Sequence, residues 1–142
     1  MIAAHLGNGA GMCATKARHS VATSMGFTAL DGLMMGRRCG AINPGVLRYL
    51  MEENPMTAGE ITQLLYKKAG LLGVSGISND MAALQASTAP EARETIKLFC
   101  FRAAGELARL ATAIGGLDAI VFTAGIGENS SLVRSLIVNW LG

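Results

Sequence analysis

Two glycine-rich segments follow short apolar runs near opposite ends of the chain. Residues 5–9 read His-Leu-Gly-Asn-Gly and follow the run 2–4, and residues 123–130 read Thr-Ala-Gly-Ile-Gly-Glu-Asn-Ser and follow the run 119–122. Backbone N–H groups in such turns are not shielded by Cβ atoms, so they can approach a flat or anionic ligand, above all where a helix begins. The two turns therefore predict a nucleotide site that is assembled from distant segments.

Composition restricts the classes of protein to which the chain can belong. Its 142 residues match one ordinary domain, and 51% hydrophobic with 15% charged residues exclude a disordered chain. The net charge is only +2 and the basic residues are scattered, so no nucleic-acid partner is expected. No apolar run reaches the ~20 residues that cross a bilayer, and the start lacks a signal-peptide pattern. We therefore expect no membrane partner and a cytoplasmic location.

The cysteines give no sign of a metal centre. Cys13, Cys39 and Cys100 are widely spaced and lack a Cys-x-x-Cys or Cys/His pattern. We expect reduced structural thiols and no metal site within these residues.

Patterning along the chain predicts a mixed α/β fold. Short β-like runs at 2–6, 12–15 and 20–23, with 16–19 as a hairpin connection, predict an antiparallel start. A further strand over 118–122 leads into the second glycine turn, after which 132–141 has helical spacing.

Helices are expected between these two groups of strands. Asn43-Pro44 should open a helix that ends near Asn54. The apolar residues at helical spacing in this helix should form its buried stripe: Val46, Leu47, Leu50 and Met51. Thr57 and Glu60 form a capping box for a second helix, which Gly70 should end.

The second half of the chain is expected to hold the longest helix. Residues 70–80 are rich in loop-forming residues, and Ser78 or Asn79 is a candidate cap for a brief helix. The longest helix should begin at 88–91 and end at Gly115-Gly116. This helix and the methionine-rich stretch 30–35 are candidates either for core packing or for a surface between subunits.

Four segments, in order and at similar spacing, resemble consecutive motifs of the acetate kinases. They are residues 5–9, residues 23–28 (Thr-Ser-Met-Gly-Phe-Thr), residues 35–40 (Met-Gly-Arg-Arg-Cys-Gly) and residues 123–130. The likeness runs over essentially all 142 residues. It implies an actin-like, sugar-kinase-like (ribonuclease H-like) fold with a mixed sheet flanked by helices, and MgATP in a cleft between two domains. Residues 1–142 would be a partial C-terminal nucleotide-binding domain, incomplete at both ends, with the N-terminal domain absent.

Transfer of a γ-phosphoryl group to a carboxylate brings two anions together, and an arginine is suited to neutralise them. By the resemblance, Arg38 matches the catalytic arginine of the family, whereas an isolated arginine would be read as a surface residue. Arg37 stands where the family usually has threonine, and we interpret it as a departure from the pattern.

The resemblance also assigns the two glycine turns and one acidic segment. The residues expected to bind phosphate are His5, Leu6, Gly7, Asn8 and Gly9. The residues expected to bind the nucleoside are Asp80, Met81, Ala82, Gly125, Ile126, Gly127, Glu128 and Asn129. Structural alternatives stay open: a tight β-turn with a satisfied histidine for the first turn, and helix caps for Asp80 and for the second turn.

Other positions depart from the family pattern. Ala82 replaces an arginine, Gly11 a hydroxyl residue, Asn43 the aspartate of an Asp-Pro pair, and Ala22 the aspartate before Thr23. Several of the lost groups are polar and near the expected cleft, which predicts weaker ATP binding. The family's Mg²⁺ ligands are expected to lie outside these residues.

Two kinds of function remain as hypotheses. One is an acetate kinase that makes acetyl phosphate and ADP from acetate and ATP, with these 142 residues alone being inactive. The other is a non-catalytic nucleotide-binding remnant. Within the kinase reading, propionate or butyrate kinase is the alternative, and the resemblance implies a homodimer.

Overall fold

The computed structural model describes all residues 1–142 and is built on a four-stranded mixed sheet. The strands are β1 (Ile2–Leu6), β2 (Ala10–Lys16), β3 (His19–Thr23) and β4 (Ile120–Thr123). Their order is β3-β2-β1-β4, with β1 antiparallel to β2 and parallel to β4. The expected antiparallel start and the mixed α/β class are therefore confirmed.

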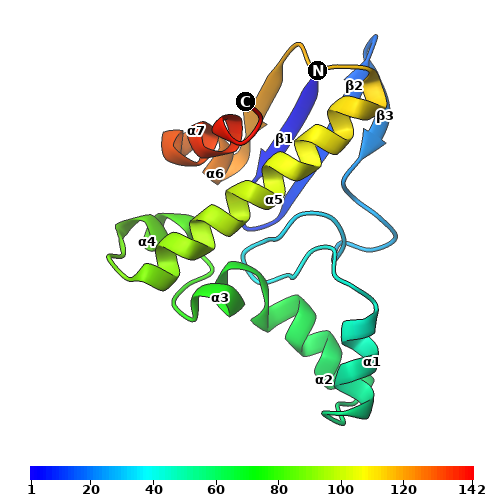
Figure 1. Ribbon diagram of the computed structural model, residues 1–142, viewed down its shortest axis with the longest axis vertical. Helices are drawn as coiled ribbons and strands as arrows, with labels where there is room; N and C mark the ends of the chain where they lie inside the picture. Colours follow the sequence, from blue (N-terminus) through cyan, green and yellow to red (C-terminus); the bar gives the residue numbers. More distant parts are fainter.

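One face of the sheet is apolar and lies under the long helix α5 (Pro90–Ile114), as Figure 1 shows. Alternate residues of β1 and β2 are buried because successive side chains of a strand point to opposite faces: Ile2, Ala4, Leu6, Met12 and Ala14. Facing them, α5 buries a stripe that includes Phe99, Ala103 and Leu107. This sheet-and-helix layer is the hydrophobic core of the chain.

Helix α5 begins and ends as its sequence predicts. Pro90 occupies the first turn, where a missing N–H costs no hydrogen bond, and Gly115 ends the helix with a φ of 76°. At the other side of the core, Leu33, Met34 and Met35 are buried, so packing rather than exposure explains this methionine-rich stretch.

Short helices fill the rest of the chain. They are α1 (Gly45–Glu52), α2 (Ala58–Gln63), the π-helix η1 (Leu64–Lys68), α3 (Gly70–Ser75), α4 (Met81–Ala86), α6 (Ala124–Asn129) and α7 (Ser131–Asn139). Figure 1 shows α1 and α2 extending away from the sheet, whereas α6 and α7 lie beside β4. None of the helices is long and apolar enough to cross a membrane.

The predicted buried stripe of α1 is wrong. No residue of α1 is buried: Val46 and Met51 are 42% and 53% exposed, and Leu47 and Leu50 are half-buried. The predicted cap is confirmed in part, since the Asn43 Oδ1 accepts a 2.7 Å hydrogen bond from the Gly45 N–H.

The prediction that a helix ends at Gly70 is confirmed, since η1 ends at Lys68, but the prediction of a loop after Gly70 is wrong. The chain changes direction at Gly70, which has a φ of 64°, and the helix α3 begins there. A Cβ at this position would overlap the Met35 carbonyl oxygen, so only glycine allows the two backbones to approach. The change of direction thus comes from a tertiary contact.

Replacing Leu107 by alanine should lower the free energy of unfolding by about 2–5 kcal/mol, because the side chain is fully buried between α5 and the sheet. Leu98→Ala in the same helix is the matched control. Leu98 is 37% exposed, and its loss should cost about 1 kcal/mol or less. Denaturant unfolding followed by circular dichroism measures both, and equal losses would contradict this packing.

The capping box of α2 should make stability depend on pH. The Thr57 backbone N–H and hydroxyl both donate to the Glu60 carboxylate and hold the pKa of that carboxyl below 4.5. A lowered pKa in the folded state gives stability that is present above the unfolded pKa and is lost as pH falls through the folded value. The difference between wild type and Glu60→Gln should therefore be constant above about pH 5 and vanish in acid.

Candidate nucleotide site

The parallel pairing of β1 with β4 brings the two glycine-rich segments to one edge of the sheet. His5 pairs with Thr123 in this register, and the His5 Nδ1 lies 3.2 Å from the Thr123 Oγ1 in a hydrogen bond. Just past this pair, a Cβ placed on Gly7 would lie 3.4 Å from the Ala124 Cβ. Segments 118 residues apart in sequence are therefore neighbours, as the glycine turns predicted.

The second glycine segment is a short helix, α6, and not the open turn that the sequence suggested. Ala124 adopts a left-handed φ of 66°, and its N–H donates to the Glu128 carboxylate at 3.0 Å. The Asn129 Nδ2 donates to the Gly125 carbonyl at 2.9 Å. These local hydrogen bonds close the segment into a helical turn because both side chains reach back to its first residues.

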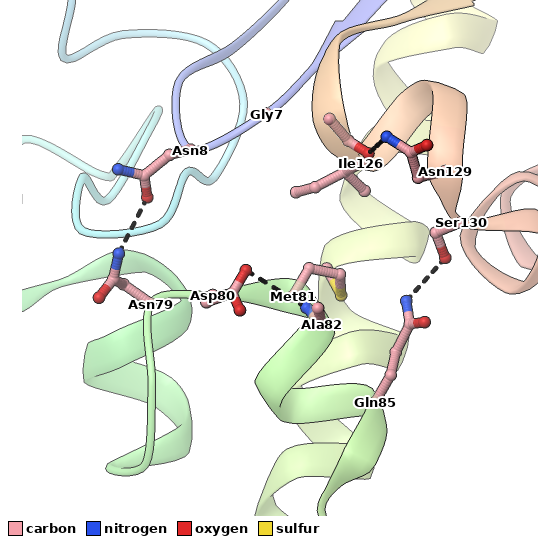
Figure 2. A pocket seen from close by; sticks show the side chains of 11 residues that line it. Gly7, Asn8, Asn79, Asp80, Met81, Ala82, Gln85, Ile126, Asn129 and Ser130 are labelled. Carbon is pink, nitrogen blue, oxygen red and sulfur yellow. Dashed lines mark hydrogen bonds between the residues drawn. The ribbon is translucent and has the colours of Figure 1, made fainter.

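A cavity of about 570 Å³ opens between the two glycine segments and α4. We call it the first cavity, and its lining consists of Gly7, Asn8, Asn79, Asp80, Met81, Ala82, Gln85, Gly125, Ile126, Asn129 and Ser130. Figure 2 shows Ile126 on the wall opposite Met81 and Ala82, with Asn8 and Asn79 at one end. Apolar side chains and backbone on two walls, with amides at one end, form a slot suited to a flat ring with a polar tail.

Most of the residues expected to bind the nucleoside line this cavity, but two do not. Gly127 is buried, and a Cβ there would lie 3.3 Å from the Phe122 carbonyl carbon, so its role is close packing of α6 on β4. Glu128 is held by the Ala124 N–H and fixes the loop. Among the expected phosphate residues, Leu6 is fully buried in the core.

Asp80 both lines the first cavity and caps a helix. Its carboxylate accepts hydrogen bonds from the Ala82 N–H at 3.4 Å and the Ala83 N–H at 3.2 Å at the start of α4. The N-cap of α4 is therefore Asp80, and not Ser78 or Asn79. A contact between Asp80 and a ribose stays a prediction.

Three residues of the lining were not predicted. Asn79 donates from Nδ2 to the Asn8 Oδ1 at 3.1 Å, and Gln85 donates from Nε2 to the Ser130 Oγ at 2.7 Å; Figure 2 shows both hydrogen bonds. Asn79 and Ser130 adjoin predicted residues in sequence, which is a signal that could have found them. Gln85 has no such signal, because only the fold brings α4 to the start of α7.

A second cavity, of about 630 Å³, adjoins the first and shares Asn8 and Asn79 with it. We call it the basic cavity, and its lining consists of Asn8, Gly9, Arg37, Arg38, Tyr66, Lys67 and Asn79. Arg38 lies against the first glycine turn, since a Cβ on Gly9 would be only 2.9 Å from its Nη2. The Arg38 Nη1 donates to the Ala29 carbonyl, which holds the guanidinium in place.

His5 and Arg38 also line one hollow, of about 430 Å³, together with Gly9. The imidazole, the guanidinium and the first glycine turn thus lie on one continuous surface that reaches α6 through Gly7. Had they lain on unrelated surfaces, a shared site would have been excluded.

The chain holds no preformed cluster of metal ligands. No group of three or more His, Cys, Asp or Glu side chains is placed to hold a metal ion. A magnesium ion that is bound through the phosphates of ATP would need only one or two side-chain ligands.

Two of the departures from the acetate kinase pattern lie at the cavities. Ala82, in place of an arginine, leaves one wall of the first cavity without a charge. Gly11 lines the hollow of His5 and Arg38, where a Cβ would lie 3.2 Å from the Met25 Sδ.

This chain is similar to solved structures of an acetate kinase and a propionate kinase. The crystal structure of Porphyromonas gingivalis acetate kinase matches with a TM-score of 0.93 and 39% identity, over 96% of this chain and 35% of that one. A propionate kinase from Francisella tularensis subsp. tularensis SCHU S4 matches with a TM-score of 0.93 and 41% identity, over 99% of this chain and 37% of that one. The fold is therefore that of a carboxylate kinase domain.

Sequence comparison identifies the family. The sequence model of the acetokinase family matches residues 1–142. The curated acetate kinase of Rhodopseudomonas palustris (strain TIE-1) is 59% identical over 145 aligned residues, which cover 100% of this chain and 36% of that protein. That of Methylocella silvestris is 54% identical with the same coverage. The chain belongs to the acetokinase family, as its motifs predicted, and it spans about 36% of the length of these relatives.

A larger side chain at position 125 should occupy part of the first cavity and weaken nucleotide binding. A Cβ at Gly125 would meet no atom within 4 Å, so Gly125→Leu places its side chain in the open space of the site. We expect the dissociation constant for ATP to rise at least about tenfold, as titration followed by amide exchange would measure. In the wild type, protection by ATP should centre on the two glycine segments and Asp80.

Gly105→Leu is the matched control for this variant. Gly105 lies in α5 away from the cavity, and a Cβ there also meets no atom within 4 Å. It should leave ATP binding unchanged. Equal ATP binding by the two variants, or protection centred elsewhere, would exclude the first cavity as the nucleotide site.

Proposed function

We propose that this chain forms one wall of an acetate kinase active site, in which ATP phosphorylates acetate to acetyl phosphate and ADP. The observation that carries the proposal is the contact of Arg38 with the first glycine turn, at the point where the two cavities meet. A nucleotide lying along the first cavity would direct its phosphates over Gly7–Gly9 toward this guanidinium. Membership of the acetokinase family supports the same reaction.

In this proposal the chain positions the reactants and neutralises charge. The Gly9 backbone N–H and the Asn8 amide would donate hydrogen bonds to the β- and γ-phosphates, whereas the Gly7 N–H already donates to the Gly9 carbonyl at 3.0 Å. The His5 ring lies on the same strand end. An acetate oxygen attacks the γ-phosphorus in line, the bond to the β,γ-bridging oxygen breaks, and ADP leaves. Arg38 stabilises the charge on the group in transfer by paired hydrogen bonds.

Several finer points belong to the proposal. We propose Mg²⁺ as the ion that accompanies ATP, with ligands outside these residues, and a homodimer in the cytoplasm as the working form. Acetate is favoured over propionate by the names of the curated relatives. Propionate is the second candidate, because the solved propionate kinase is as similar to this chain as the solved acetate kinase.

A chimera tests the function. This chain would replace the matched segment of the R. palustris acetate kinase, and acetyl phosphate would be trapped as the hydroxamate. We expect ATP-dependent turnover with acetate, and a loss of about 10³-fold or more in kcat for Arg38→Ala, because the transferring group loses its counter-charge. Arg48→Ala is the control, since Arg48 is exposed on α1 and pairs only with Glu52.

The outcomes separate the proposal from its alternatives. A folded chimera that binds ATP without forming acetyl phosphate would support the non-catalytic remnant, and a preference for propionate would support the second candidate. The 142-residue chain by itself should form no acetyl phosphate. Robust turnover by that chain would contradict the expectation that further catalytic groups lie outside these residues.

A further inference from the structure

The basic cavity holds an unbalanced positive charge. Arg37, Arg38 and Lys67 line it, and no acidic side chain does. None of the three takes part in an ion pair, although other basic residues of the chain do. Cations gathered around one cavity repel each other and raise the local concentration of anions.

Backbone hydrogen bonds force these like charges together. The loop that carries Arg37 and Arg38 is tied to the segment around η1 by four backbone hydrogen bonds. Their donors are the N–H groups of Cys39, Ala69, Leu71 and Leu72, and their acceptors, at 3.1, 3.1, 2.9 and 3.0 Å, are the carbonyls of Leu65, Arg37, Met35 and Gly36. Lys67 lies within the π-helix between these anchor points. Such single turns of π-helix occur often at functional sites. The arrangement is thus built by the fold and is not a chance meeting of flexible side chains.

A chain of hydrogen bonds links Arg37 to the first glycine turn. The Arg37 Nη2 donates to the Asn79 Oδ1 at 3.4 Å, and the Asn79 Nδ2 donates to the Asn8 Oδ1 at 3.1 Å. Because each amide oxygen accepts, the Asn8 Nδ2 is left as a free donor, and Figure 2 shows it turned away from Asn79. A Cβ on Gly36 would overlap the Asn8 Oδ1, so this orientation also needs glycine there.

We propose that Arg37 and Lys67, with Arg38 and the Asn8 amide, form a phosphate subsite in the basic cavity, and that Arg37 positions Asn8 through Asn79. The inference rests on the proposed function for Asn8 and Arg38 and deepens it, because it adds Arg37 and Lys67 to the same site. Its occupant is a phosphate group, either the terminal phosphate of the nucleotide, which would reach the cavity across Asn8 and Gly9, or free inorganic phosphate.

Calorimetric titration with inorganic phosphate, at constant ionic strength set by sodium chloride, tests the subsite. We expect Arg37→Thr and Lys67→Gln each to weaken phosphate binding about tenfold, because each removes a charge-assisted contact. Lys68→Gln is the matched control. Lys68 belongs to the same π-helix but lines a different hollow, beside Glu60, and its loss should leave phosphate binding unchanged.

Titrations with ATP and AMP separate the two sources of phosphate. Competition between ATP and phosphate, with ATP but not AMP binding weakened in both variants, would identify the terminal phosphate of the nucleotide. Simultaneous binding of ATP and phosphate would identify free phosphate. Unchanged phosphate and ATP binding in Arg37→Thr and Lys67→Gln, with wild-type circular dichroism, would overturn the subsite. Because no readout needs phosphoryl transfer, failure of the kinase proposal would leave these results interpretable.

Discussion

The parallel pairing of β1 with β4 is the constraint on which the rest of the site depends. Parallel strands end at the same edge of a sheet, so the residues that follow them become neighbours whatever their separation in sequence. Here that edge places Gly7 beside Ala124 and joins the His5 ring to Thr123. Burial of Ile2, Ala4 and Leu6 under α5 fixes which face of β1 points inward and thereby stabilises the register.

A second constraint acts through backbone contacts between the loop 35–39 and the segment 65–72. Gly36 and Gly70 lack the Cβ atoms that would collide with Asn8 and with the Met35 carbonyl, so loop, turn and helix approach closely. The result is that positive side chains stand beside the glycine turn at a fixed distance from the first cavity. Charge and cavity are thus held together by main-chain hydrogen bonds, which depend little on salt or side-chain entropy.

The two adjoining cavities differ in charge. Asp80 is the only charged residue that lines the first cavity, whereas Arg37, Arg38 and Lys67 line the basic cavity. The acetokinase family model matches the whole chain, and the chain spans about 36% of the length of its curated relatives.

The sequence alone determined the elements whose signals are local. The strands of the hairpin, the capping box of Thr57 and Glu60, and both ends of α5 follow from alternation, side-chain caps and glycine, all of which act within a few residues. The motifs also predicted the family and most of the lining of the first cavity. Only the tertiary structure decided that no residue of α1 is buried, that Gly70 begins a helix, and that Gln85 and Lys67 reach the cavities. Each of these features depends on which residues are neighbours in space, and periodicity along the chain does not indicate those neighbours.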